Sequence, residues 1–258
     1  MVTGASRGIG RAVAIELASR GFDAVATMRN PADGADLDGV DRVRVQRLDV
    51  TDPDTIALPA GLRVLVNNAG VESDNLPLEL MPADAWSRMF ATNVFGLVEV
   101  TRRAVPLMRA AGGGVICNVT SSSTLAPVPF LGTYRASKAA VTAIGESLAA
   151  EVAQFGIRVV EIMPGPIETD MLAGSEKPSP AIDHPDYHDL AARMWEGRKA
   201  VVDAYTPAAE AARRIVDAIC DDDGPLRYGC DDLSAGMLGG WNATDNAQWV
   251  RGMLRSFS

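Results

Sequence analysis

The chain has 258 residues, 47% of them hydrophobic, which is enough for one α/β domain with a substantial core. Its formal net charge of −9 argues against a nucleic acid or an anionic membrane surface as partner. The sequence has no apolar run of about 18 residues, no signal-peptide pattern at its start and no CxxC pair among its three cysteines. We therefore expect a cytoplasmic protein without a transmembrane helix.

Short β-branched runs alternate with longer amphipathic stretches. In chain order, we expect a helix at 9–20, strands at 23–28, 42–49 and 63–67, a helix at 82–111, a strand at 114–120, a helix at 134–155, a strand at 157–163 and a helix at 207–220. This alternation predicts one α/β domain over residues 1–258, a Rossmann-type doubly wound parallel sheet with helices on both faces. Residues 170–206 should be an insertion over the carboxyl edge of the sheet, where ligands bind.

Two segments are shorter than such a fold usually has. Only Met1 and Val2 precede the glycine-rich loop, whereas a strand has about five residues. The first strand is therefore either truncated or preceded by further residues. The crossovers at 30–41 and 51–62 are near the lower limit of about a dozen residues, so each should hold at most one or two helical turns. The tail from Ala235 has no assignment.

The segment TGASRGIG at residues 3–10 lies just before the first helix. Glycines there allow a tight turn and a close approach of the backbone to a pyrophosphate at the N-terminus of that helix. A loop that merely connects two elements is the alternative. We expect a dinucleotide site formed by Gly4, Ser6, Arg7, Gly8, Ile9 and Gly10.

The next strand ends in Met28 and Arg29, where a protein that uses NAD usually has a carboxylate for the ribose hydroxyl. An arginine favours a 2′-phosphate instead, and Arg7 lies in reach of the same group. NADP(H) is therefore predicted over NAD(H), with two solvated arginines as the alternative. Later strand ends add further cofactor contacts at Asp49, Val50, Asn68, Ala69 and Gly70.

Tyr134 and Lys138 are spaced so that a helix places them on one face. A neighbouring ammonium lowers the pKa of a phenol, which is normally about 10, and so prepares it for proton transfer near neutrality. Ser121 follows the strand at 114–120, where its hydroxyl can hold a substrate carbonyl beside the phenol. Ser122 is the alternative for that role.

Taken together, these motifs resemble the short-chain dehydrogenase/reductase family over about residues 1–170. The resemblance implies that Tyr134 exchanges a proton with the substrate oxygen and that Ser121 polarises the carbonyl. It implies that Lys138 lowers the pKa of Tyr134 and binds the nicotinamide ribose. It further implies that Asn93 interrupts its helix and holds a water in a proton relay. The matching segments are TGASRGIG, Asp49-Val50, NNAG at 67–70, Asn93, Ser121, Tyr134 with Lys138, and PGPIET at 164–169, which adds Pro164, Gly165, Ile167 and Thr169 to the cofactor site.

The resemblance implies an NADP(H)-dependent oxidoreductase that interconverts a carbonyl compound and an alcohol, with a hydrophobic steroid- or retinoid-like substrate. One alternative is a 3-oxoacyl-thioester reductase, and another is a non-catalytic NADP-binding regulator or scaffold. Because relatives pair the helices that correspond to 82–111 and 134–155, a homodimer or homotetramer is expected.

Two features of the insertion have competing interpretations. His184 and His188 have the spacing of helical metal ligands, but Pro185 lies between them, so no metal site is expected. Aromatic and apolar side chains near the insertion either form a substrate wall or pack the insertion onto the sheet. These side chains are Phe130, Met171, Tyr187 and Trp195.

Overall fold

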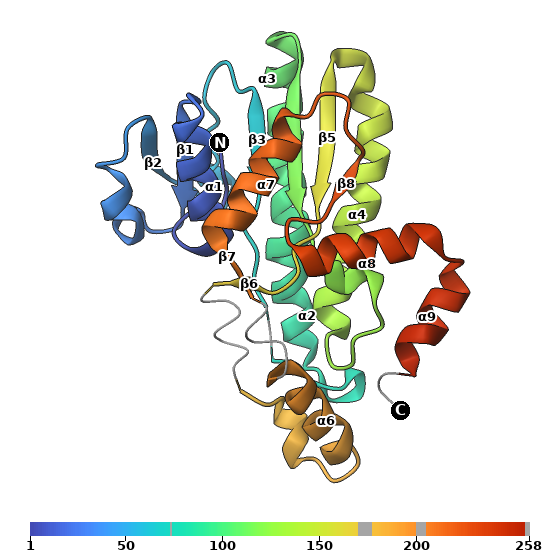
Figure 1. Ribbon diagram of the computed structural model, residues 1–258. Coiled ribbons are helices and arrows are strands. Elements are labelled where there is room, and N and C mark those ends of the chain that lie inside the picture. The colour runs from blue at the N-terminus through green and yellow to red at the C-terminus, as the bar shows by residue number, and fades with distance from the viewer. Residues whose placement is uncertain (73, 170–176, 200–204, 256–258) are drawn as a thin grey trace.

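A twisted parallel sheet runs through the molecule, and helices cover both of its faces (Figure 1). The computed structural model describes residues 1–72, 74–169, 177–199 and 205–255. The sheet contains, in spatial order, β2 (Val43–Arg47), β1 (Ala24–Met28), β3 (Val64–Asn67), β4 (Gly114–Val119), β5 (Ile157–Ile162) and β8 (Arg227–Tyr228). The predicted Rossmann-type fold is therefore confirmed.

The first strand is reduced to a single residue, Val2, which bridges Ala26 of β1 and Val66 of β3 in parallel. The Met1 amine donates to the Val64 carbonyl at 2.8 Å, and the Thr3 amide donates to the Val66 carbonyl at 2.9 Å. These bonds hold the chain between β1 and β3 although no regular strand forms. As a result, the glycine loop begins at the carboxyl ends of two central strands.

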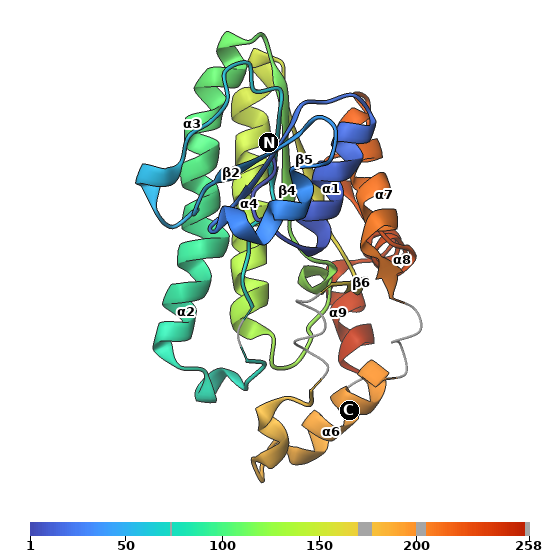
Figure 2. The same ribbon diagram turned by 90° about the vertical axis from the view of Figure 1, so that its left-hand side faces the viewer.

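The two short crossovers contain only 3₁₀ turns, Pro31–Leu37 and Pro53–Thr55, as their lengths predicted. Helices on one face are α1 (Gly8–Ser19) and α7 (Ala208–Cys220), and on the other α3 (Leu97–Ala110) and α4 (Gly132–Val152). Figure 2 shows the sheet between these two pairs. Every residue of β1 is buried, because both faces of the sheet are covered.

The long helix predicted at 82–111 is divided. It consists of α2 (Ala83–Phe90), a π-helical turn at Ala91–Gly96, and α3. A π-helical turn inside a helix re-aims side chains and is frequent at functional sites. The turn contains Asn93, so the interruption lies where the family resemblance placed it.

The insertion begins and ends with a short parallel pair, β6 (Ile167–Glu168) and β7 (Thr206–Pro207). Its described part contains a 3₁₀ turn at Pro180–Asp183 and α6 (His188–Lys199). The tail forms α8 (Asp232–Ala243) and α9 (Asn246–Leu254), and Trp249 donates to the Leu125 carbonyl at 2.6 Å. Among the described residues, no helix has both the length and the apolar character needed to cross a membrane.

Candidate active site

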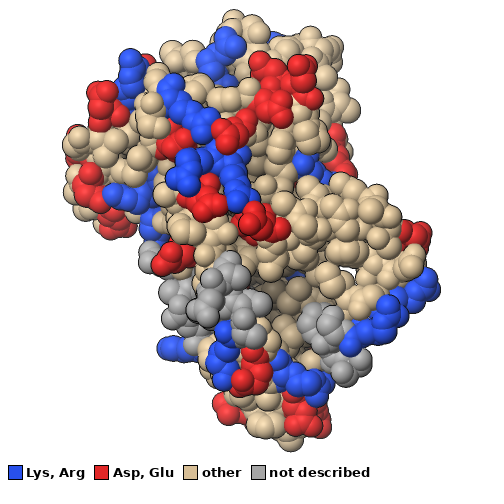
Figure 3. Space-filling model, in the orientation of Figure 1, with Lys and Arg blue, Asp and Glu red and all other residues tan. Residues whose placement is uncertain are grey.

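A cavity of about 630 Å³ opens at the carboxyl ends of the strands. On this face the surface is hollowed between α8 and the segment that carries α6 (Figure 3). Two of the residues predicted for the site do not line the cavity, Gly10 and Asn93. The predicted residues that do line it are Gly4, Ser6, Arg7, Gly8, Ile9, Arg29, Asp49, Val50, Asn68, Ala69, Gly70, Ser121, Tyr134, Lys138, Pro164, Gly165, Ile167 and Thr169.

The glycine loop packs directly against the end of β3. Gly4 has a φ of +64°, and a Cβ atom there would lie 2.7 Å from the Ala69 Cα. The Asn68 amide donates to the carbonyls of Thr3 and Gly4, at 3.0 Å each. A Cβ on buried Gly10 would lie 2.3 Å from the Asn68 Nδ2. Asn68 and Gly10 thus shape the loop by packing, which explains why Gly10 does not face the cavity.

The N-terminus of α1 faces the cavity through Gly8 and Ile9. Arg7 is the N-cap residue and makes no side-chain capping bond. Backbone N–H groups in a first helical turn, together with the helix dipole, attract an anion. The loop and the start of α1 therefore fit the diphosphate of a dinucleotide.

Groups that suit an adenosine ribose gather at the end of β1. Arg7 and Arg29 are both exposed side chains in the cavity wall. Asp33 also lines this wall, and its carboxylate accepts a bond of 2.9 Å from the Asn30 amide. Asp49 accepts bonds from the amide and hydroxyl of Thr51, at 2.9 and 2.7 Å. Two cations and one amide-held carboxylate thus lie together in the cavity wall at the end of β1.

Tyr134, near the start of α4, is half-buried, and the Ser121 hydroxyl lies close enough to its phenol to influence its pKa. The Ser121 Oγ also lies 2.9 Å from the Ser123 Oγ. The Ser122 amide donates to the Pro164 carbonyl at 2.9 Å, and its side chain is buried. Of the two candidate serines, the structure places Ser121 against the phenol.

Lys138 lies one turn after Tyr134, with its Nζ 5.7 Å from the centre of the phenol ring. This Nζ donates to the Val119 carbonyl at 2.9 Å, and burial lowers the pKa of Lys138 to about 8. Burial, together with the charge of Glu72, raises the pKa of Tyr134, although the nearby Ser121 hydroxyl acts in the opposite direction.

The expected lowering of the pKa of Tyr134 is therefore wrong for the protein residues alone. Desolvation of the phenol is the largest cause of the raised pKa, while the Lys138 ammonium lies beside the ring and bonds to a backbone carbonyl. A raised pKa keeps the phenol protonated at neutral pH. In this state Tyr134 is a proton donor.

Asn93 secures the segment after β3. Its Oδ1 accepts from the Val71 amide at 2.8 Å, and its Nδ2 donates to the Val71 carbonyl at 3.0 Å and to the Ser137 hydroxyl at 3.1 Å. A Cβ on Gly70 would lie 3.4 Å from the Asn93 Oδ1 and 3.6 Å from the Lys138 Nζ. Asn93 and Lys138 thus both lie beside Gly70, and a part of Asn93 in a proton relay stays a prediction.

The segment at 164–169 is anchored by a residue that sequence reasoning missed, Asp231. Its buried carboxylate accepts from the Gly165 amide at 2.7 Å and from the Ser234 hydroxyl at 2.6 Å. Asp231 also caps α8 through the Ser234 amide. Asp231 and Ser234 have the spacing of a capping box, and this sequence signal would have located the start of α8.

The substrate wall differs from the aromatic wall proposed from sequence. Phe130 and Tyr187 pack edge to face, with centroids 6.1 Å apart, and neither they nor Trp195 line the cavity. The substrate-wall interpretation is thus not supported for these three, packing of the insertion onto the sheet stays a prediction, and Met171 lies outside the described residues. His184 and His188 belong to no cluster of possible metal ligands within the described part of the chain. Residues not anticipated in the wall include Glu72, Val128, Leu131, Arg198, Tyr205, Leu233 and Met237.

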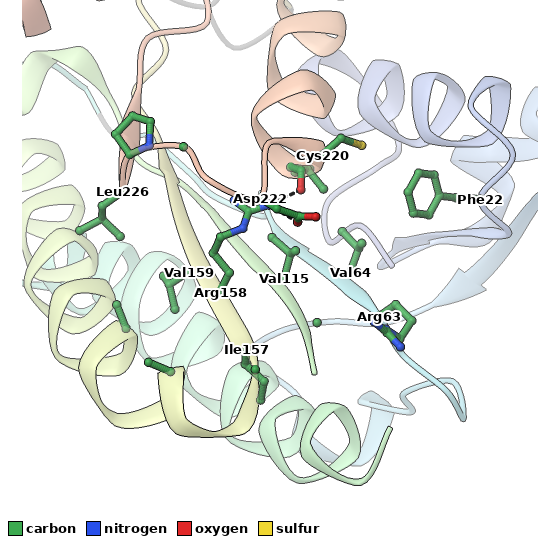
Figure 4. A pocket seen from close by; sticks show the side chains of 17 residues that line it. Phe22, Arg63, Val64, Val115, Ile157, Arg158, Val159, Cys220, Asp222 and Leu226 are labelled. Carbon is green, nitrogen blue, oxygen red and sulfur yellow. Dashed lines mark hydrogen bonds and ion pairs between the residues drawn. The ribbon is translucent and has the colours of Figure 1, made fainter. Parts of the chain in front are cut away.

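A second cavity, of about 800 Å³, lies at the opposite edge of the sheet, between the strands and α7 (Figure 4). Its wall includes Phe22, Val115 and Ile157, and an ion pair of 3.7 Å joins Arg158 to Asp222. None of the residues predicted for the site lines this cavity. The chemistry is therefore assigned to the carboxyl edge.

Comparison with known proteins agrees with this geometry. The family model described as short chain dehydrogenase matches residues 1–179. An uncharacterized oxidoreductase, YusZ of Bacillus subtilis (strain 168), is 36% identical over 189 residues, which cover 68% of this chain and 67% of that protein. A cis-4-hydroxycyclohexanecarboxylate dehydrogenase of Sinomonas cyclohexanicum is 35% identical over 243 residues, 87% and 94% of the two chains. A crystal structure of a short chain dehydrogenase from Burkholderia cenocepacia J2315 in complex with NADP has a TM-score of 0.76, with 26% identity over 96% of this chain and 93% of that one.

Proposed function

This chain belongs to the short-chain dehydrogenase/reductase family, and from that premise we propose that it interconverts an alcohol and a carbonyl compound with NADP(H). One observation carries the proposal. Tyr134, Ser121 and Lys138 line the same cavity as the glycine loop, and the Ser121 hydroxyl lies beside the phenol. The bound cofactor supplies or accepts the hydride.

Side chains of the protein position the substrate and transfer the proton. In the direction of reduction, the Ser121 hydroxyl bonds to the substrate carbonyl oxygen and holds it beside the phenol. Tyr134 is protonated at neutral pH and donates its proton to that oxygen as negative charge develops. The Lys138 ammonium lies beside the ring and stabilises the phenolate that remains. In oxidation the same groups act in reverse.

The preference for NADP(H) over NAD(H) rests on charge at the end of β1. Arg7 and Arg29 supply two cations, and the guanidinium fork suits a phosphate. The opposing carboxylate, Asp33, already accepts a bond from Asn30. The NADP bound to the Burkholderia protein supports this preference.

A hydrophobic substrate agrees with the apolar part of the wall, formed by Val128, Leu131, Leu233 and Met237. The Sinomonas relative, named for a hydroxylated cyclohexane acid, supports an alicyclic alcohol or ketone. Steroids, retinoids and 3-oxoacyl thioesters remain in the panel of candidates.

The test is NADPH oxidation by the wild-type protein and by Tyr134→Phe, with cyclic ketones, steroids, retinoids, quinones, sugars and acyl thioesters. We expect Tyr134→Phe to lose at least about 100-fold in kcat because the proton donor is gone, while its Kd for NADPH stays within about threefold. Ser87→Ala, which changes an exposed residue of α2, is the control and should turn over substrate like the wild type. Equal turnover by Tyr134→Phe would contradict the assignment, and comparable kcat/KM with NADH and NADPH would contradict the cofactor preference.

A further inference from the structure

Arg198 is a cation in the catalytic cavity that none of the recognised motifs explains. It lies near the end of α6 and lines the cavity together with Tyr134 and Ser121. It stands about two turns after Ala191, which is fully buried, and therefore on the inward face of the helix. The neighbouring Lys199 pairs instead with Glu196 at the surface, at 2.5 Å.

The guanidinium of Arg198 has an unsatisfied donor. Its Nε is buried, yet it has no hydrogen-bond partner among the residues that the structure describes. A buried donor without an acceptor is costly, and such donors are rare in folded proteins. The planar fork of arginine matches a carboxylate with two parallel bonds. A ligand that brings a carboxylate to this position would satisfy it.

Other groups of the wall define where that carboxylate lies in the substrate. Val128, Leu131, Leu233 and Met237 offer apolar contacts. Glu72 lies in the wall near the reacting end, where its charge acts on Tyr134. A carboxylate attached directly to the reacting carbon would be repelled by Glu72, whereas one on the far side of an apolar body would not.

We propose that Arg198 binds a carboxylate of the substrate, so that this enzyme acts on a hydrophobic hydroxy or oxo acid whose acid group is remote from the reacting carbon. This inference rests on the function proposed above. It makes Arg198 a specificity-determining residue, because an uncharged analogue of the same shape would leave the guanidinium unpaired.

The kinetic test compares 4-oxocyclohexanecarboxylate with its methyl ester, using NADPH and the full-length protein. We expect the wild-type protein to favour the acid, and Arg198→Met to lose at least about tenfold in kcat/KM for the acid but less than about twofold for the ester. Arg198→Lys keeps the charge and loses the planar fork. Its kcat/KM for the acid should lie between those of the wild type and Arg198→Met. Lys199→Met removes the same charge from the same helix outside the cavity and should match the wild type.

A binding test separates this inference from the proposed function. Cyclohexanecarboxylate has no carbonyl to reduce, and its Kd for the NADP-loaded protein is measured by calorimetry. We expect Arg198→Met to raise this Kd at least about tenfold. If no ketone were turned over but this binding still depended on Arg198, the proposed function would fail and the carboxylate site would stand.

Two results would overturn the inference. One is a ratio of kcat/KM for the acid to kcat/KM for the ester that is unchanged in Arg198→Met, with cyclohexanecarboxylate bound as tightly as by the wild type. The other is a Kd for NADPH raised about tenfold or more in Arg198→Met at an unchanged acid-to-ester ratio, because Arg198 would then bind a phosphate of the cofactor. Thermal unfolding of both Arg198 variants verifies that they are folded.

Discussion

At the scale of single residues, burial is the largest influence on the pKa values of Tyr134 and Lys138, the two residues proposed to be catalytic. Lys138 is only 6% exposed, and its ammonium depends on the Val119 carbonyl for a partner. Tyr134 loses water around its phenol, and the charge of Glu72 adds to the effect. Both groups are therefore biased toward their neutral forms before any ligand binds.

This bias predicts a pH-dependent stability of the cofactor-free protein. The pKa of Lys138 is about 8 in the folded protein and 10.5 ordinarily, so between these values the unfolded chain holds more protons and the free energy of unfolding rises with pH. Lys138→Met lacks this rise. Its stability relative to the wild type should fall by up to about 3 kcal/mol between pH 8 and 10.5.

Urea unfolding of both proteins at pH 7.5 and 10 measures this change. Lys177→Met removes an exposed lysine instead and serves as the control. A difference between Lys138→Met and the wild type that is the same at both pH values would show that the buried amine does not titrate in this window.

At the scale of elements, the π-helical turn decides how the segment after β3 is held. It directs Asn93 toward Val71, where one side chain satisfies both the amide and the carbonyl of that residue. An uninterrupted α-helix would shift this side chain around the axis. The same stretch of sequence therefore forms a long helix and holds the backbone of Val71 beside Gly70 and Lys138. The two bonds between Asn93 and Val71 are called the clamp below.

We expect Asn93→Ala to accelerate amide hydrogen exchange at Val71 and to lower the free energy of unfolding by about 1–3 kcal/mol, because both backbone groups lose their partner. Turnover should fall by more than the affinity for NADPH, since Asn93 lies beside Gly70, as does Lys138, which is proposed to be catalytic. Ser87→Ala, one helix earlier and exposed, should change none of these. Unaltered exchange at Val71 would show that the clamp is unnecessary.

At the scale of the whole molecule, an aromatic patch on the α2–α3 side points to self-association. The rings of Trp86 and Phe90 lie 6.2 Å apart, and Phe95 continues the row at 6.5 Å from Phe90. Phe95 is 65% exposed, and Val98, one turn later, is also exposed. The patch adjoins the cluster that joins this side to α4, so we infer that it is the surface where two copies of the chain meet.

Phe95→Asp should shift the protein to monomers in sedimentation at micromolar concentration, because a charge would then be buried in the interface. Leu254→Asp places the same charge at an exposed apolar residue of α9 and is the control. A wild-type protein that sediments as a monomer would contradict the inferred interface.

Much of the architecture was predictable because it depends on local patterns. The buried β-branched runs located β1 to β5, and motifs at strand ends located the cofactor side of the cavity. Arg198 and Asp231 were not predictable, since they reach the site only through tertiary packing of the insertion and the tail. The raised pKa of Tyr134 also depends on burial, which spacing along the chain does not reveal.

The bond between Gly165 and Asp231 has a consequence for the time course of synthesis. A ribosome makes the chain from its N-terminus, so the glycine loop, Tyr134 and Lys138 exist well before the residue that anchors the 164–169 segment. Until residue 231 has been added, the nascent chain lacks the carboxylate that accepts the bond from the Gly165 amide. Full anchoring of the 164–169 segment therefore follows the synthesis of residue 231, well after that of the glycine loop.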